Sequence, residues 1–277
     1  MDYHIGVSKM RTVKVSSVTL ETPAVKSFMF NDKLCSEAKP GQFIMVWIPG
    51  IDEVPMSLSM LNPKRSQVAV TVERVGEASG VLHKMKVGDT IGVRGPFGNG
   101  YTLKNAGKVM IMGGGTGLAS LTPLTEKLAK GRMEITFLMG AKTKSNLLFH
   151  TRIRKLLSRV KAQLIVTTED GTFGRKGMVT TQAEKLLKQG EQFDMIYACG
   201  PEKMMQKVFL SSERFHVPFE ASLERFMRCA IGICGTCVIG RYRVCKDGPV
   251  FSGKQLREVR DEFGHWRRGF DGRKTTV

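Results

Sequence analysis

The sequence lacks a long apolar run of the kind that crosses a membrane or directs export. Residues 1–12 mix charged residues with few apolar ones, and the most apolar later stretch, 109–121, is interrupted by four glycines. A secretory signal needs an uninterrupted apolar segment, and a membrane-spanning helix needs about 20 apolar residues. We therefore expect a soluble, cytoplasmic protein with no membrane partner.

Acidic residues are also scarce, since 25 Asp and Glu stand against 43 Lys and Arg and give a formal net charge of +18. Clustered cations would bind nucleic acid by releasing counterions from its phosphates. In this chain the cations are scattered through every segment, and the mild excess in residues 254–274 is diluted by acidic residues. We therefore expect no nucleic-acid binding, and interpret the basic surface as serving dinucleotide ligands or an acidic partner.

The chain is long enough, at 277 residues, for two domains and a small appendage. Its first part, to Gly95, consists of short β-branched or alternating runs separated by turn residues, which predicts a small antiparallel β-barrel interrupted by one short helix. The predicted strands are Thr12–Leu20, Val25–Phe30, Gln42–Ile48, Gln67–Val75 and Thr90–Arg94, and the predicted helix is Ser79–Met85.

From Lys108 onward strands alternate with helices, which predicts a parallel sheet covered by helices, the nucleotide-binding class of α/β fold. The predicted strands are Val109–Met112, Ile135–Met139, Leu164–Thr167 and Met195–Ala198, and the predicted helices are Leu118–Lys130, Thr151–Leu157, Val179–Lys188 and Glu202–Arg214. After Pro218 the pattern ends, and we expect a third, small unit organised by a metal centre. The predicted domains are residues 1–102, 103–220 and 221–277.

Four of the six cysteines fall in this last unit with the spacing C-x4-C-x2-C-x7-C; they are Cys229, Cys234, Cys237 and Cys245. The first three reproduce the spacing of plant-type ferredoxins, which bind a [2Fe–2S] cluster. Gly232 and Gly235 lie inside the loop, where a chain that wraps a cluster needs unusual backbone angles and close approach of amide groups to sulfur. The spacing therefore favours a [2Fe–2S] cluster.

Two alternatives to the cluster are a structural zinc site and a set of disulfides. Zinc ribbons usually contain two Cys-x2-Cys pairs, and this loop contains one. Disulfides are disfavoured in a chain for which no export is expected. Of the remaining cysteines, Cys35 is interpreted as a small apolar filler, whereas Cys199 stands at the end of a predicted strand and is equally compatible with a core thiol and with a nicotinamide contact.

A glycine loop follows the first strand of the α/β part, at Gly113, Gly114, Gly115, Thr116 and Gly117. A strand, a glycine loop and a helix start direct backbone amides and a helix dipole toward a phosphate. The loop does not match G-x-G-x-x-G, so it predicts a shorter kind of dinucleotide loop, and a glycine-rich turn without a ligand remains the alternative. In the barrel part, segments 55–59 and 76–79 are weaker candidates for flavin contacts, since the second pattern alone is usually just a helix cap.

The order of these motifs resembles the ferredoxin–NADP reductase superfamily over nearly the whole chain: a barrel, a glycine loop, and Cys199-Gly200-Pro201 after the last strand. Within that superfamily, Ser222-Leu223-Glu224-Arg225 before the cysteines and residues 245–251 after them resemble the electron-transfer subunits of NAD-dependent dihydroorotate dehydrogenases. The resemblance implies FAD in the barrel, NAD at the second domain and [2Fe–2S] in the C-terminal unit. It also implies an FMN-containing catalytic partner subunit in a heterotetramer, with electrons passing from FMN through the cluster and FAD to NAD+.

The resemblance also implies roles for individual residues. Pro55, Met56 and Ser57 fall on the family's flavin-binding Arg-Pro-x-Ser segment, but Val54 stands where the family commonly has Arg. We expect Arg74 to supply the missing charge to the flavin phosphates. The remaining implied contacts are Ala78 and Ser79 at the flavin phosphates, and Gly113–Gly117 with Cys199, Gly200 and Pro201 at the nicotinamide nucleotide. No side chain is nominated as a catalytic acid or base, because the cofactors carry the chemistry.

The same tail also resembles two rival families, the diaphorase-like γ subunits of soluble hydrogenases and the flavin subunit of anaerobic sulfite reductase. Residues 251–256 and 262–264 favour the dihydroorotate subunit. A rival of another class is a zinc-stabilised module that binds nucleic acid. The preference for NAD or NADP is left open by Lys142 and Lys144, which are as compatible with plain surface charge as with a 2′-phosphate site.

Overall fold

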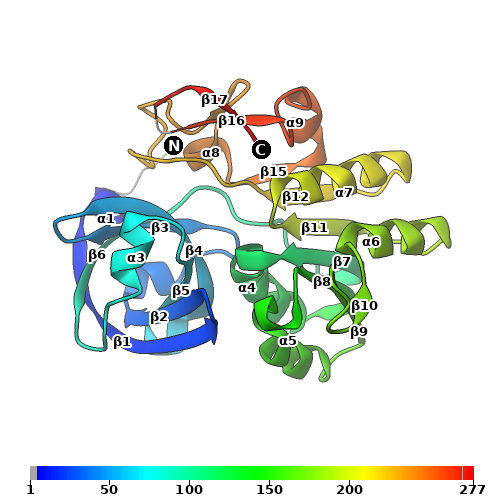
Figure 1. The fold of residues 1–277 in the computed structure, drawn as a ribbon, viewed down its shortest axis with the longest axis horizontal. Helices are drawn as coiled ribbons and strands as arrows, with labels where there is room; N and C mark the ends of the chain where they lie inside the picture. Colours follow the sequence, from blue (N-terminus) through cyan, green and yellow to red (C-terminus); the bar gives the residue numbers. More distant parts are fainter. Residues whose placement is uncertain (1–4, 270) are drawn as a thin grey trace.

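The computed structural model describes residues 5–269 and 271–277. It has three parts (Figure 1): a β-barrel on one side, a helix-covered sheet on the other, and a C-terminal unit that lies over both. This is the predicted class of fold, a ferredoxin-reductase-like barrel followed by a parallel-sheet α/β region. Among the helices of the described part of the chain, none is both long and apolar enough to cross a membrane.

The barrel is closed by six strands in the order β1-β2-β5-β4-β3-β6. They are β1 (Arg11–Thr22), β2 (Val25–Asn31), β3 (Phe43–Ile48), β4 (Asp52–Asn62), β5 (Gln67–Glu73) and β6 (Thr90–Phe97). Short helices connect them: α1 (Ile5–Ser8) before β1, α2 (Lys33–Ser36), η1 (Pro63–Arg65) and α3 (Glu77–Leu82). The alternating apolar residues of each strand, such as Val68, Val70 and Val72 of β5, fill the barrel interior.

Strand β4 was not predicted, and helix α3 begins and ends earlier than predicted. Pro55 lies inside β4, and a proline within a run argues against a strand. The amino half of β4 pairs with β3 and the carboxyl half pairs with β5. Pro55 therefore lies where only one neighbouring strand is paired, and a missing N–H is tolerated there.

The second part is a seven-stranded sheet in the order β10-β9-β8-β7-β11-β12-β15. Its strands are β7 (Ala106–Gly114), β8 (Arg132–Ala141), β9 (Ala162–Thr168), β10 (Arg175–Lys176), β11 (Met195–Cys199), β12 (Phe219–Ser222) and β15 (Val250–Ser252). All pairings are parallel except that of β12 with β15. Strands β12 and β15 were not predicted, because four and three residues are too few to show a period.

Helices cover both faces of this sheet (Figure 1). They are η2 (Gly115–Gly117), α4 (Leu118–Leu128), η3 (Lys144–Asn146), α5 (His150–Leu157), α6 (Val179–Lys188) and α7 (Glu202–Arg214). Leu121 and Leu124 of α4 share a core with Ile153 of α5 on one face, whereas α6 and α7 pack in a separate core on the other. The bounds of α6 and α7 match the prediction.

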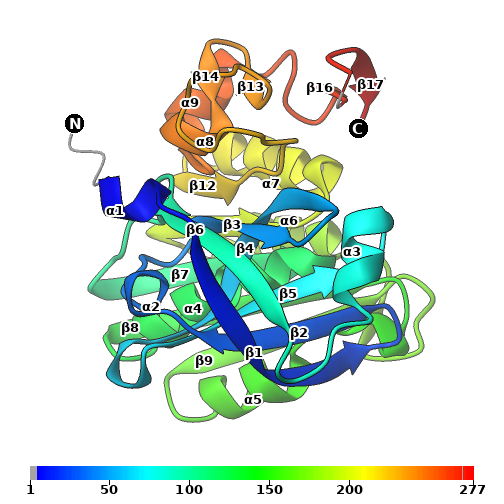
Figure 2. The same ribbon diagram turned by 90° about the vertical axis from the view of Figure 1, so that its left-hand side faces the viewer.

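The C-terminal unit contains β13 (Val238–Ile239), β14 (Tyr242–Arg243), α8 (Val244–Asp247), α9 (Gly253–Glu258), β16 (Trp266–Arg268) and β17 (Lys274–Thr276). Among the described residues, its apolar side chains do not form a core of their own. Met227, Cys237 and Phe263 belong to the same buried cluster as Phe209 of α7 and Phe43 of β3. The unit is therefore held against both other parts by a shared core, and it lies at one end of the molecule in Figure 2. Its strand β15 pairs with β12 and extends the sheet.

Candidate functional site

The four predicted cluster ligands are brought together as two pairs. The backbone N–H groups of Ile233 and Cys234 point to Cys229 Sγ, at 3.4 Å and 3.5 Å. The backbone N–H of Cys245 points to Cys237 Sγ at 3.4 Å. Cys237 and Cys245 are buried, Cys229 is partly exposed and Cys234 is exposed. A group held by all four sulfurs would therefore have one side in the protein and one near solvent.

The backbone of the loop has the unusual angles that the glycines predicted. Gly232 and Gly235 adopt φ values of 80° and 73°, and Ala230 adopts 61° despite its Cβ. At Gly232 a Cβ would also approach the side chain of Lys246 to 2.7 Å. These positive φ values turn successive amide groups inward, toward the sulfurs.

The chemistry of this donor set fits an iron–sulfur cluster. Within the Cys237–Cys245 pair, the hydrogen bond between the two sulfurs lowers the pKa of the Cys237 thiol to about 7, against the effect of burial, and raises the pKa of Cys245. Burial raises the pKa of Cys234, but hydrogen bonds from Thr236 and Cys229 outweigh it and lower the pKa to about 6. Thiolates are the ligands that iron–sulfur clusters require.

The arrangement in pairs is the one that a two-iron cluster uses. Cys229 lies with Cys234, and Cys237 lies with Cys245. A two-iron cluster takes two thiolates on each iron. The donor set therefore fits a [2Fe–2S] cluster.

The two predicted nucleotide loops lie side by side at the carboxyl edge of the sheet. Gly113 of β7 pairs with Cys199 of β11. A Cβ on Gly117 would lie 2.4 Å from the backbone of Cys199 and Gly200, and one on Gly200 would lie 2.8 Å from the carbonyl oxygen of Gly114. The glycines are required for this close approach, and they place the loop at the start of α4, where a helix N-terminus favours a phosphate.

Cys199 itself is a buried thiol. Its side chain is 2% exposed, and its Sγ contacts the carbonyl oxygen of Ser222 at 3.6 Å. Burial, with a smaller contribution from Glu224, raises the pKa of Cys199 to about 12. The thiol is therefore protonated at neutral pH.

The residues predicted to contact the flavin lie in the barrel part of the chain. Pro55, Met56 and Ser57 are half-buried in β4, which packs against α4, and β5 contacts η2. Arg74 is exposed directly after β5 and lines a cavity of about 600 Å³ with Lys26 and Lys84. A cationic hollow therefore lies against α3, the helix predicted to approach the flavin phosphates.

Ser79 caps the helix in which it lies. Its Oγ accepts hydrogen bonds from the backbone N–H groups of Val75 and Gly76, at 2.9 Å and 3.0 Å. Ala78, the preceding predicted contact, is half-buried. The cap expected of a bare Gly-x-x-Ser pattern is thus present, and it fixes the loop before α3.

A buried ion pair that was not predicted ties the cysteine unit to the nucleotide loop. The guanidinium of Arg225 donates to both carboxylate oxygens of Glu202, at 2.5 Å and 3.0 Å, and the side chains are 1% and 7% exposed. Glu202 directly follows Pro201, and its Oε1 also accepts the backbone N–H of Gly264 at 2.9 Å. Arg225 and Gly264 lie 23 and 62 positions after Glu202 in the sequence, and both contact it at the start of α7.

A second ion pair between distant residues, also not predicted, joins two strands of the barrel near the cysteine loop. Arg94 of β6 donates to both carboxylate oxygens of Glu53 in β4, each at 2.7 Å. Hydrogen bonding to Glu53 raises the pKa of Arg94, and the nearby Cys229 adds to the rise. A fixed cation of the barrel therefore lies near one cluster ligand.

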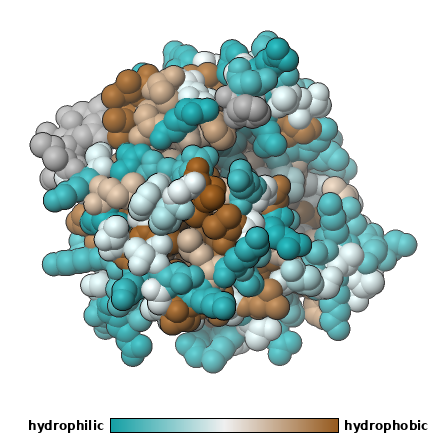
Figure 3. Space-filling view, turned by 60° about the vertical axis from the view of Figure 1, so that its left-hand side comes forward, coloured by the Kyte–Doolittle hydropathy of each residue, from teal (hydrophilic) through white to brown (hydrophobic). Residues whose placement is uncertain are grey.

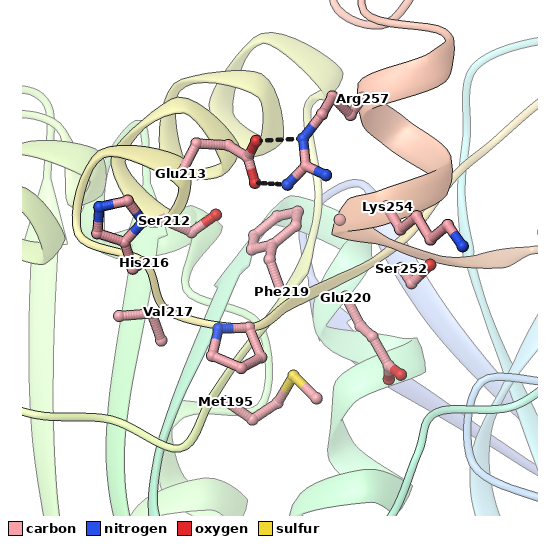
Figure 4. Close-up of a pocket in the computed structure, with 12 residues that line it drawn as sticks. Met195, Ser212, Glu213, His216, Val217, Phe219, Glu220, Ser252, Lys254 and Arg257 are labelled. Carbon is pink, nitrogen blue, oxygen red and sulfur yellow. Dashed lines mark hydrogen bonds and ion pairs between the residues drawn. The ribbon is translucent and has the colours of Figure 1, made fainter.

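A separate cavity of about 570 Å³ lies at the other end of the sheet (Figure 4). It is lined by Met195, the first residue of β11, and by the ion pair between Glu213 and Arg257. Cys199 lies at the opposite end of the same strand. None of the predicted site residues lines this cavity, so it is separate from the candidate site.

Comparison with family descriptions supports both halves of the site. Residues 224–257 match the family described as the iron-sulfur cluster binding domain of dihydroorotate dehydrogenase B. Residues 110–209 match the oxidoreductase NAD-binding domain. The matched regions contain the four cysteines and the two nucleotide loops.

Relatives that match nearly the whole chain belong to the same family as the matched iron–sulfur domain. A protein of Methanocaldococcus jannaschii, called a probable dihydroorotate dehydrogenase B (NAD(+)) electron transfer subunit, is 41% identical over 94% of this chain and 96% of its own. A protein of the same description from Methanocella arvoryzae is 40% identical over 95% of this chain and 97% of its own length.

Solved structures show the same fold. A chain of an NADH-dependent reduced ferredoxin-NADP oxidoreductase is 31% identical with a TM-score of 0.80 and covers 90% of this chain and 91% of that chain. The cytochrome b5 reductase domain of Ulva prolifera nitrate reductase is 18% identical, with a TM-score of 0.65, over 76% of this chain and 94% of that domain. The second likeness concerns the fold alone.

Proposed function

This chain belongs to the family of dihydroorotate dehydrogenase B electron transfer subunits, and we propose that it carries electrons from an FMN-containing catalytic subunit to NAD+ in pyrimidine biosynthesis. The observation that carries the proposal is the pairing of the four cysteines in a unit that shares its core with the nucleotide-binding sheet. The comparisons favour this family over the hydrogenase and sulfite reductase alternatives.

In the proposed mechanism the protein contributes position and environment. Cys229, Cys234, Cys237 and Cys245 would hold the cluster, the barrel strand β4 with helix α3 would hold FAD, and the loops at Gly113–Gly117 and Cys199–Pro201 would hold NAD. When bound, FAD and the cluster supply the conversion between single electrons and a hydride. The neutral, buried thiol of Cys199 contributes an apolar wall at the nucleotide loop, because its raised pKa keeps it uncharged.

The proposal is tested by the cofactor content and reducibility of the anaerobically purified protein. About one FAD and about two irons per chain are expected, with a visible spectrum that bleaches on addition of NADH. With its catalytic partner the protein should reduce NAD+ when dihydroorotate is added. Zinc in place of iron, with no flavin, would contradict both the cofactors and the function.

We propose that Arg74 holds the flavin phosphates in place of the arginine that the family commonly has at position 54. In support, Arg74 lines a hollow that also contains two lysines and a face of α3. Arg74→Ala is expected to weaken FAD binding by about tenfold, the usual size of one charge-assisted contact to phosphate. FAD retention after gel filtration measures the effect, with Arg65→Ala on the other end of β5 as the control; equal retention in both variants would refute the role.

We propose that the catalytic subunit docks on the exposed edge of the cysteine loop, so that electrons reach the cluster directly. Ile233, next to Cys234, is 78% exposed, the kind of apolar anchor found at interfaces. Figure 3 shows one patch of apolar side chains at the upper left of this face and further apolar side chains at its centre. We infer a heterotetramer from the family resemblance.

Ile233→Asp is expected to weaken the complex by about 30-fold or more, because a buried apolar anchor contributes roughly 2 kcal/mol and a carboxylate there must be desolvated. Co-elution with the catalytic subunit measures it, and the visible spectrum shows whether the cluster is retained. Leu210→Asp is the matched control, since Leu210 is 58% exposed on α7. A complex of unchanged affinity would place the interface elsewhere.

A second candidate function is supported by the 31% identity and TM-score of 0.80 to the ferredoxin-NADP oxidoreductase chain. In that case the partner would be a different oxidoreductase subunit. Reduction of NAD+ by dihydroorotate in the reconstituted complex distinguishes the two. We propose that the reaction takes place in the cytoplasm, where reducing conditions keep cysteines available as cluster ligands.

A further inference from the structure

Arg243 reaches the cysteine loop from the hairpin that follows the loop in the sequence. It is the last residue of β14 and stands two positions before Cys245. Its Nη1 donates to the carbonyl oxygen of Gly232 at 3.2 Å. Gly232 lies inside the loop, between Cys229 and Cys234. A cation of the hairpin is therefore in direct contact with the backbone that separates two of the proposed cluster ligands.

The carbonyl that Arg243 contacts and the amide that points to a cluster sulfur belong to one peptide group. The carbonyl of Gly232 and the N–H of Ile233 share a planar trans peptide, so they point in opposite directions. The nitrogen of Ile233 lies 3.4 Å from Cys229 Sγ. A chain of hydrogen bonds therefore runs from the guanidinium through this peptide to the sulfur. Hydrogen bonds in such a chain polarise one another, so the cation strengthens the contact between the amide and the sulfur.

Asp247 holds the guanidinium in this position. Its Oδ2 accepts the backbone N–H of Arg243 at 2.7 Å and lies 3.8 Å from the Arg243 Nε. The longer distance is that of an ion pair and is too long for a hydrogen bond. The Arg243 side chain is 40% exposed, but its Nε is buried. The positive charge is therefore fixed beside the loop, and solvent screens it only in part.

The two redox states of a [2Fe–2S] cluster differ by one negative charge. Hydrogen bonds to the sulfurs and a nearby cation stabilise the reduced state more than the oxidised state, and they raise the reduction potential. Cys229 is partly exposed, and its neighbour in the pair, Cys234, is exposed. Water would solvate this side of the cluster in both states, so a fixed donor and a fixed cation here add an effect that the solvent alone does not give.

We propose that Arg243 is a positioning residue that raises the reduction potential of the cluster through the peptide between Gly232 and Ile233. The inference rests on the proposed function, because it requires the four cysteines of the loop to hold a [2Fe–2S] cluster. Arg243 is not itself a ligand and acts through the loop. A higher potential makes the cluster a better acceptor for electrons that arrive from the catalytic subunit.

The test is the midpoint potential of the cluster in Arg243→Gln, measured by anaerobic redox titration with electron paramagnetic resonance of the reduced cluster. We expect the ratio of reduced to oxidised cluster at a given potential to fall about tenfold, which for one electron is a lowering of about 59 mV. The potentials of FAD in the same titration should not change. Arg243→Lys keeps the charge and one donor and should restore part of the potential.

The matched control is Arg241→Gln, which removes a cation from the turn of the same hairpin. The Arg241 side chain is 72% exposed and pairs with Glu258. Because solvent screens this charge, the potential of the cluster should stay at the wild-type value. An unchanged potential in Arg243→Gln, or a fall of the same size in both glutamine variants, would overturn the role of Arg243 and leave the proposed function standing.

Asp247→Asn provides a second test with the opposite sign, and it decides the question if Arg243→Gln loses its iron. The amide oxygen of asparagine can still accept the N–H of Arg243, but the guanidinium loses its counter-charge. The ratio of reduced to oxidised cluster should therefore rise about threefold at a given potential. A ratio that is unchanged or lower would overturn the role of Arg243. Wild-type protein purified without iron would instead contradict the proposed function.

Discussion

Replacement of Cys237 by serine is expected to remove the iron from the protein and, with it, electron exchange with the catalytic subunit. Cys237 is 2% exposed, and the backbone N–H of Cys245 points to its Sγ at 3.4 Å, so its sulfur is placed to bind iron together with that of Cys245. A serine hydroxyl titrates far above neutral pH and is a harder ligand. Since even outer-shell changes cost about 10–100-fold in metal affinity, loss of a ligand should lower dihydroorotate-dependent NAD+ reduction by at least about a hundredfold.

The same variant should keep its flavin and its NADH oxidation with an artificial acceptor, because neither the barrel nor the nucleotide loops depend on Cys237. Cys35→Ser is the control: Cys35 is also buried, but its Sγ accepts a hydrogen bond from Arg11 at 3.3 Å inside the barrel, far from the other cysteines in the chain. Iron analysis, the visible spectrum and the two activities separate the variants. Two irons persisting in Cys237→Ser would contradict the ligand assignment.

The fold class could be predicted because its elements obey local periods. The change from alternating runs to strand–helix alternation is visible in the sequence. Helix α6 was predicted with its observed bounds, and α7 was predicted approximately where it lies. Strand β4 was missed because of Pro55, and β12 and β15 because strands of four and three residues show no period. These two strands are stabilised by neighbours distant in sequence, so local propensity carries little information about them.

The candidate site also has parts that local sequence patterns predict and parts that they do not. The cysteine spacing and the glycine loop are local patterns whose chemistry follows from residue type, and the structure places each set together. The contacts of Glu202 with Arg225 and of Arg94 with Glu53 join residues 23 and 41 positions apart. The segment that leads from β12 to the cysteines lies beside the nucleotide loop only because β12 pairs with β11, which no local pattern shows.

The shared core has a consequence for how the three parts work together. The cysteine unit buries its apolar residues against α7 and β3 and has no separate core among the described residues. Inter-domain contacts of this kind disfavour free motion of the unit. The cysteine loop should therefore keep a fixed position relative to the barrel and the nucleotide loop. Electron transfer from the cluster through FAD to NAD+ requires such fixed positions.

Arg225→Met is expected to lower the melting temperature on the order of 10 °C, because it leaves the Glu202 carboxylate buried without a counter-charge. Breaking one partner of a buried pair costs roughly 3–5 kcal/mol, and each kcal/mol shifts a protein of this size by about 2–4 °C. The side chains involved are 1% and 7% exposed, and Glu202 also anchors Gly264. Loss of the pair should therefore loosen the cysteine unit and the tail together, and iron should be released at a lower temperature than in the wild type.

The matched control is Arg257→Met, which breaks an ion pair of similar geometry on the surface. Arg257 donates to both carboxylate oxygens of Glu213, at 2.7 Å and 2.8 Å, but the side chains are 57% and 33% exposed. Water solvates both charges when this pair is broken, so the melting temperature should hardly change. If the two variants melt at the same temperature, the buried pair is not what holds the cysteine unit on the start of α7, and the shared apolar core must hold it alone.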